Sequence, residues 1–240
     1  MKKLFSVILC GLLTAPVVSS AGFLDDFLNR LSKPSGKGTD TSTIISGLKE
    51  ALTIGTDKAV KEVSRVDGYF GNEMIKILMP EDLQKVAAIL GKAGFQKQVD
   101  DFVLSMNRAA EEAAPRAAPI FVDAIKGMSI ADAGKILRGG DTAATDYFKV
   151  KTSAKLSEAF KPIISSSMND VGVTRSYKAM MAKYEVLPFV DRVSIDLDQY
   201  VTDKSLEGLF SMVGREEKKI RTDPAARVTD LLKQVFGKEN

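Results

Sequence analysis

Apolar residues recur at intervals of three and four along most of the chain from residue 44, and this is the spacing of an amphipathic helix. The first such stripe consists of Ile44, Ile45, Leu48, Ala51 and Leu52. Later stripes are separated by glycines, prolines and short polar turns. We therefore predict an all-α fold in which residues 44–237 form an irregular, single-domain bundle of several helices.

Residue types that start and stop helices divide this pattern into separate elements. Pro80 and the two acidic residues behind it predict a helix start, because the first turn tolerates proline and favours negative charge. Pro115 predicts a kink or a break, since it removes a backbone donor. Ser129 and Asp132 have the spacing of a capping box. In chain order, we expect helices at about 44–63, 80–94, 96–114, 120–125 and 129–139, a helix that begins after its cap Asp141, and further helices at about 152–169, 175–186, 203–220 and 224–236.

Only two short stretches have the character of β-strands, MIKILM at 74–79 and FVDRVSIDL at 189–197. Both combine apolar and β-branched residues. Neither lies beside a hairpin turn such as Asn-Gly, so no pairing partner is evident. We expect at most one or two very short strands.

Residues 1–21 have the pattern of a signal peptide. A basic start precedes an apolar run, and Ser19 and Ala21 place small side chains at the third and first positions before a cleavage site. We predict cleavage between Ala21 and Gly22. The mature chain is then expected to be periplasmic.

The segment 22–43 is expected to be a flexible tether, because its second half, SKPSGKGTDTST, has no apolar period and is rich in Ser, Gly and Lys. Cys10 is the only cysteine, and Leu9 before it argues against processing as a lipoprotein, which requires a small residue there. Cleavage after residue 21 would remove this thiol, and with it any disulfide. No later segment has the roughly 18 consecutive apolar residues that cross a bilayer.

The chain contains no histidine, which excludes several familiar catalytic and metal-binding arrangements. Serine hydrolases with a histidine base and zinc sites with histidine ligands are both unavailable. The 34 basic and 31 acidic residues leave a net charge of +3, which does not indicate a nucleic-acid partner. We expect no metal site and no cofactor.

Two segments hold residues that could bind a ligand. In MNRAAEEAAPRAAPIF, a surface ion pair between Arg108 and either Glu111 or Glu112 is the simpler interpretation, and an anion site formed by Arg108 and Arg116 beside the proline break is the alternative. In DTAATDYF, Asp141 is expected to cap a helix and Tyr147 to pack in the core. The alternative is that Asp141 or Tyr147 contacts a ligand.

The stretch EEKKIRTDPAAR near the C-terminus has the pattern of a junction between two helices. Asp223 is the predicted N-cap and Pro224 the first residue of the last helix. Arg227 would then lie in the first turn of that helix, where a cation is unfavourable. We predict that Arg227 is buried or half-buried in an ion pair with a nearby glutamate or a distant acid. If it were exposed and unpaired, it would form an anion site with Arg221.

Residues 45–237 resemble a bacterial family of exported helical proteins that is described only as a domain of unknown function. The stretches that carry the resemblance are GLKEALTIGTDKAV at 47–60, MNRAAEEAAPRAAPIF at 106–121, AATDYF at 143–148, YVTDKSLEGLF at 200–210 and EEKKIRTDPAARVTDLLKQVFG at 216–237. The resemblance implies export and a helical fold. It assigns no activity and no catalytic residue.

The sequence favours a non-enzymatic periplasmic or envelope-associated protein that binds a protein partner or an apolar, lipid-like ligand. A local cluster of Tyr177, Met180, Met181 and Tyr184 is expected to be a helix-packing face, although methionine-rich surfaces also adapt to apolar ligands. An open groove would indicate a protein partner, and an enclosed apolar cavity a lipid-like ligand. The alternative is a hydrolase-type enzyme that acts on cell-envelope material with converging carboxylates and Lys or Arg.

Overall fold

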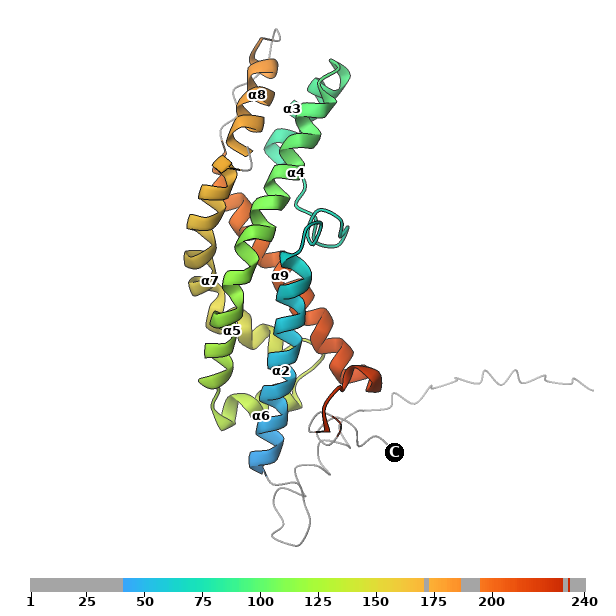
Figure 1. Ribbon diagram of the computed structural model, residues 1–240, viewed down its shortest axis with the longest axis vertical. Coiled ribbons are helices and arrows are strands. Elements are labelled where there is room, and N and C mark those ends of the chain that lie inside the picture. The colour runs from blue at the N-terminus through green and yellow to red at the C-terminus, as the bar shows by residue number, and fades with distance from the viewer. Residues whose placement is uncertain (1–40, 171–172, 187–194, 231–232, 234–240) are drawn as a thin grey trace, which may run out of the picture. The chain divides into compact units, whose positions relative to one another are not determined.

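The computed structural model describes residues 41–170, 173–186, 195–230 and 233 (Figure 1). The predicted signal peptide and cleavage site, nearly all of the predicted tether and most of the second strand candidate lie outside these residues. Within the described ranges every regular element is a helix, which confirms the all-α prediction. These residues belong to one compact unit that starts at Thr41.

The helices follow one another with short connections in most places. In chain order they are α2 (Thr41–Ser64), α3 (Glu81–Lys92), α4 (Gln96–Ala113), the 3₁₀ turn η1 (Ala114–Arg116), α5 (Ala117–Lys126), α6 (Ile130–Arg138), α7 (Ala143–Asp170), α8 (Val173–Glu185), α9 (Leu197–Thr222) and the 3₁₀ turn η2 (Pro224–Ala226).

Helix α9 organises the core because it packs on both α2 and α7. It crosses obliquely behind the helices nearest the viewer in Figure 1. Helix α5 packs on α2 and α7, while α4 packs on α7 and α8. The rings of Phe121, Phe148 and Phe210 join α5, α7 and α9, with centroids 5.1 Å apart for the first two and 6.2 Å apart for Phe121 and Phe210. Aromatic pairs at such separations add to the stabilisation from burial alone.

Pro115 interrupts the helix as predicted, but only for a single turn. The α-helix α4 ends at Ala113, three residues form η1, and α5 resumes at Ala117. Pro115 has no N–H to donate to the preceding turn, so the tighter 3₁₀ geometry replaces the α-helical bond there. The small side chains of Ala113, Ala114 and Ala117 are fully buried at this junction.

The helix expected to begin after Asp141 and the further helix expected at about 152–169 form one continuous helix. Helix α7 begins at Ala143 and continues through Pro162 to Asp170. Phe148, Leu156 and Phe160 are fully buried along it. Burial of this apolar stripe accounts for a helix that passes through a proline, because packing stabilises helices more than intrinsic propensity does.

The strand candidate at 74–79 does not form a strand. Met74 and Ile75 lie in a turn and the backbone continues without regular structure to Pro80. Ile75, Ile77 and Met79 are buried while Met74 and Leu78 are exposed. The apolar pattern therefore marks a half-buried connection that lies on the helices rather than a strand paired with another strand.

The last predicted helix does not start at Pro224. Pro224–Ala226 form a 3₁₀ turn, and Arg227 and Val228 are not helical. Asp223 caps this turn as predicted, because its side chain accepts a hydrogen bond of 2.9 Å from the Ala225 N–H. Val228 is 57% exposed, so it is not part of the apolar stripe expected for this helix.

The capping box at the start of α6 is confirmed. The Ser129 side chain accepts from the Asp132 N–H, and the Asp132 carboxylate accepts from the Ser129 N–H and hydroxyl. These hydrogen bonds, the Ser129 hydroxyl first among them, lower the pKa of Asp132.

Replacement of Ser129 by Ala is expected to destabilise α6, since loss of a serine cap costs about 0.5–2 kcal/mol of unfolding free energy. The pKa of Asp132 should rise toward the ordinary carboxyl value, and an NMR pH titration would measure this. A depressed folded-state pKa stabilises the fold above the ordinary carboxyl pKa, and the gain is lost as the pH falls through the folded value. The difference between wild type and variant should therefore shrink in acid, and a constant difference would contradict the assignment.

Candidate functional site

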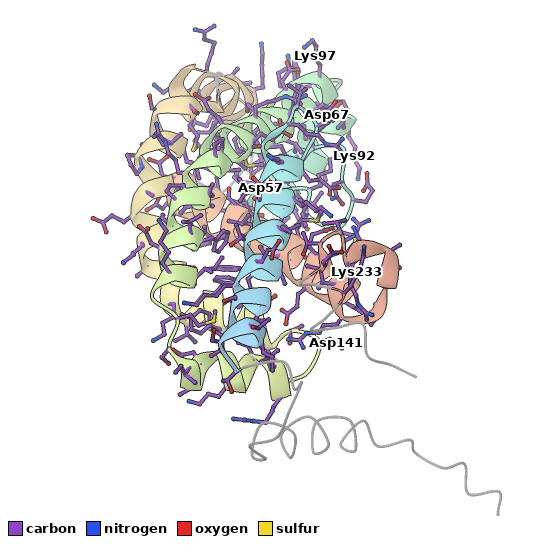
Figure 2. The ribbon with its side chains drawn as sticks, turned by 60° about the horizontal axis from the view of Figure 1, so that its bottom comes forward. Asp57, Asp67, Lys92, Lys97, Asp141 and Lys233 are labelled. Carbon is purple, nitrogen blue, oxygen red and sulfur yellow. The ribbon has the colours of Figure 1, made fainter. Side chains whose placement is uncertain are left out.

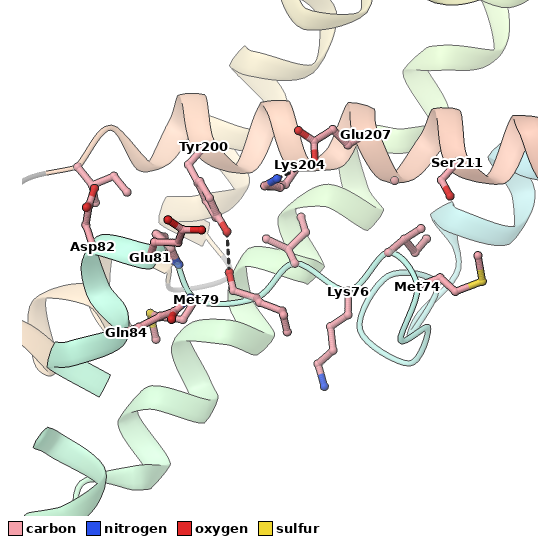
Figure 3. Close-up of a pocket in the computed structure, with 16 residues that line it drawn as sticks. Met74, Lys76, Met79, Glu81, Asp82, Gln84, Tyr200, Lys204, Glu207 and Ser211 are labelled. Carbon is pink, nitrogen blue, oxygen red and sulfur yellow. Dashed lines mark hydrogen bonds and ion pairs between the residues drawn. The ribbon is translucent and has the colours of Figure 1, made fainter. Parts of the chain in front are cut away.

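An open groove of about 660 Å³ lies between the connection 74–80 and helix α9. One wall consists of residues 74–82 and Gln84, and the other is formed by one face of α9 (Figure 3). The α9 face contributes Tyr200, Lys204, Gly208 and Ser211. The groove therefore joins segments more than a hundred positions apart in the sequence.

Asn107 of α4 holds the first wall in place from below. Its side-chain oxygen accepts from the Ile77 N–H at 2.8 Å, and its amide donates to the Ile77 and Val103 carbonyls, each also at 2.8 Å. Asn107 is fully buried. A single amide side chain thus satisfies the backbone of Ile77 as a neighbouring strand would.

The backbone of Leu78 faces α9, on the side of the connection opposite to Asn107. Its carbonyl accepts a hydrogen bond of 3.0 Å from the Tyr200 hydroxyl (Figure 3). Burial raises the pKa of Tyr200, which keeps the hydroxyl protonated and able to donate. The Leu78 N–H has no hydrogen-bond partner within the described part of the chain. Since its side chain is also 61% exposed, Leu78 offers both a free donor and an apolar contact.

Gly208 lets the connection approach α9 closely. A side-chain carbon at this position would lie 2.6 Å from the Tyr69 ring and 3.2 Å from Cβ of Ile75. The buried Tyr69 hydroxyl donates to the Ser205 carbonyl at 2.6 Å, and burial, with Glu111 nearby, raises its pKa. Glycine at this position therefore sets the depth of the groove floor.

Acidic groups predominate along the groove. Glu81 and Asp82 line one end, and Glu207 lies on the opposite wall, 2.7 Å from its partner Lys204 (Figure 3). The Lys76 side chain extends away from α9, and its ammonium lies 4.2 Å from the centre of the Phe70 ring. The pair on α9 neutralises itself, whereas Glu81 and Asp82 have no ion-pair partner among the described residues.

Arg108 lies outside this groove, and its predicted ion pair is confirmed. It binds Glu111 at 2.6 Å and Asp67 at 2.7 Å. The buried Glu111 carboxylate also accepts from the backbone N–H groups of Tyr69 and Phe70. The structure thus gives Arg108 a role in holding the turn at 67–71, whose Asp67 has a positive φ of 63°. Arg116 lies exposed on η1.

Asp141 does not cap α7, contrary to the prediction. It lies on the surface between α6 and α7, 3.7 Å from Lys218 (Figure 2). The cap is the buried Glu217 of α9, whose carboxylate accepts from the Ala144 N–H at 2.9 Å and the Thr145 N–H at 2.8 Å. Tyr147 is half-buried against Phe148 as predicted.

Arg221 and Arg227 use their guanidinium groups within the fold. Arg221 pairs with Glu217 at 2.7 Å and donates to the Ile136 carbonyl. Arg227 is buried, which confirms that part of its prediction. The prediction of a carboxylate partner is wrong, because Arg227 donates instead to the Ile220 and Arg221 carbonyls at the end of α9. Cations there satisfy the free carbonyls of a helix C-terminus.

The six candidate residues do not form one site. Arg108 is paired with Asp67, which lies at the opposite end of the described bundle from Asp141 (Figure 2). The residues that line the groove were absent from the sequence-based candidates. Two signals could have indicated them: the alternation of buried and exposed apolar residues at 74–79, and a lone asparagine among the alanines of α4.

A family model described as "Protein of unknown function (DUF4197)" matches residues 38–237. The match agrees with the extent of the resemblance recognised in the sequence. No match to a curated protein or to a solved structure was found.

Proposed function

The chain belongs to the family described as protein of unknown function DUF4197, and from its groove we propose a non-enzymatic protein that binds an extended segment of a partner protein in the cell envelope. One observation carries this proposal: the unpaired Leu78 N–H beside an open groove with apolar walls. An extended peptide that pairs with an exposed backbone gains main-chain hydrogen bonds, and pockets for its side chains provide specificity.

The shape of the groove favours a peptide over a lipid-like ligand. Lipid-like molecules require a cavity that buries most of their surface. The groove is open to solvent rather than enclosed, and no arginine of the described residues lines it. The exposed Met74 and Leu78 side chains suit contact with a protein chain, because methionine adapts to varied apolar partners.

An enzyme remains the second candidate because carboxylates from distant segments line the same groove. Glu81 and Asp82 begin α3, and Glu207 lies on α9. All three are exposed, and Glu207 is paired with Lys204. A general acid is usually shielded from water, so these exposed carboxylates favour an enzyme less than a peptide-binding protein. Turnover of purified peptidoglycan that a Glu81→Gln/Glu207→Gln variant abolishes would establish the enzyme instead.

The location in the envelope is part of the proposal and rests on the N-terminal pattern of a basic start, an apolar run and small residues before Gly22. Among the described residues, no helix combines the length and the apolar character that a membrane span requires.

Selection from a library of random twelve-residue peptides tests the proposed binding. The wild-type protein should enrich a set of peptides, and fluorescence anisotropy should then give their affinities. A Met74→Asn/Leu78→Asn variant is expected to bind about tenfold more weakly or worse, because it places two polar amides in apolar contacts. Val150→Asn on α7 is the control, since Val150 is 84% exposed and does not line the groove. Absence of enrichment, or equal weakening by both variants, would refute the proposal.

A further inference from the structure

The uneven charge of the groove distinguishes its two ends. Glu81 and Asp82 follow directly after Pro80, where the connection becomes α3. Tyr200 lies on the α9 wall at this same end (Figure 3). Ser211 and Met74 lie at the other end, where no acidic side chain of the described ranges lines the groove. A peptide in the groove therefore meets negative charge at one end only.

The cations near the acidic end do not offset it. Lys204 is committed to Glu207 at 2.7 Å. Lys76 also lines the groove, but its side chain extends away from α9 and its ammonium lies over the Phe70 ring. The effect of the carboxylates extends into the groove, because both Glu207 and Glu81 add to the burial that raises the pKa of Tyr200, while Lys204 opposes them.

We propose that the partner segment bound in the groove carries a lysine or arginine that contacts Glu81 and Asp82; this inference rests on the proposed function. Complementary charge across an interface fixes register and selects partners. The same end does not suit a metal ion, because no group of three metal-ligating side chains gathers within the described residues. A long basic side chain on a peptide fits both the charge and the apolar walls, since its methylene stem packs on apolar surface.

The position of the basic residue follows from the extended backbone. Leu78 and Glu81 are three positions apart, which corresponds to roughly 10 Å of extended chain. The peptide residue whose carbonyl accepts a hydrogen bond from the Leu78 N–H should therefore lie about two to four positions from the basic residue of the same peptide. We therefore expect peptides that bind the groove to carry an apolar residue two to four positions from a lysine or arginine.

The peptides enriched from the random twelve-residue library test this inference. They should contain lysine and arginine well above the frequency in the starting library, at the stated separation from an apolar residue. Binding should weaken when salt is raised from about 0.05 M to about 0.5 M, because exposed charge pairs are screened. An enriched set without an excess of basic residues would overturn the inference and leave the proposed function intact. Absence of any enrichment would overturn both.

Neutral variants locate the contact. Glu81→Gln/Asp82→Asn is expected to weaken binding of a basic peptide roughly 3- to 30-fold, in the range of two partly exposed ion pairs. Glu112→Gln/Glu158→Gln changes the net charge equally at exposed positions on α4 and α7 that do not line the groove, and it should leave the affinity unchanged. All four residues are exposed, so both proteins should fold. Equal affinities for the two variants would refute the assigned contact.

Discussion

Replacement of Glu217 by Ala is expected to lower the free energy of unfolding by about 3–5 kcal/mol, the range seen when one partner of a buried ion pair is removed. The Glu217 carboxylate is buried and binds the backbone N–H groups of Ala144 and Thr145, the Thr145 hydroxyl and Arg221. Without it, the first turn of α7 loses its acceptor, and a largely buried guanidinium loses its charge partner. Urea denaturation followed by circular dichroism would measure the loss.

Glu207→Ala is a matched control on the same helix. Glu207 also pairs with a cation at 2.7 Å, but its side chain is 65% exposed. Exposed pairs contribute about 0–1 kcal/mol, so this variant should unfold close to wild type. If the two variants lost similar amounts, the importance assigned to the buried cap would be wrong.

Replacement of Asn107 by Ala is expected to cost about 2–4 kcal/mol, because the Ile77 N–H and carbonyl both lose their partner in a buried position. The loss should be concentrated in the wall of the groove. Hydrogen exchange of the Ile77 amide should accelerate more than exchange in the middle of α9. Affinity for the selected peptides should fall as well, although Asn107 does not line the groove.

Gln96→Ala is the control for Asn107. Gln96 is an amide on the same helix, but it is exposed and bonds only to the neighbouring Asp100 side chain among the described residues. A surface change of this kind is usually worth within about 0.5 kcal/mol. Unchanged exchange of the Ile77 amide in Asn107→Ala would contradict the proposed support of the groove wall.

The helical class and several helix starts could be predicted from the sequence because their causes are local. The apolar stripe of α2 and the capping box of Ser129 and Asp132 each depend on residues a few positions apart. The break at Pro115 follows from the chemistry of one residue. Local rules of this kind identify which elements form.

The groove was not predicted because its contacts join distant positions, although two weak signals in the sequence belong to it. Ile77 pairs with Asn107, 30 residues away, so the strand-like pattern at 74–79 suggested a sheet that the fold does not contain. The same limit explains the wrong cap at α7. Asp141 has the local spacing of an N-cap, yet the acceptor is Glu217, more than seventy residues further along the chain. Arg227 was correctly expected to be buried, but the backbone carbonyls that bind it have no sequence signature.

The packing of α2 on α9 determines when folding can finish. These helices are nearly the first and last of the described chain, and Tyr69 just beyond α2 bonds to Ser205, 136 residues later. Contacts between distant positions require closure of a long loop before they contribute free energy, and such topologies fold slowly. The apolar face of α2 therefore has no complete docking surface until α9 has been synthesised. We therefore expect the core to be completed only after α9 has been synthesised, rather than helix by helix from the N-terminus.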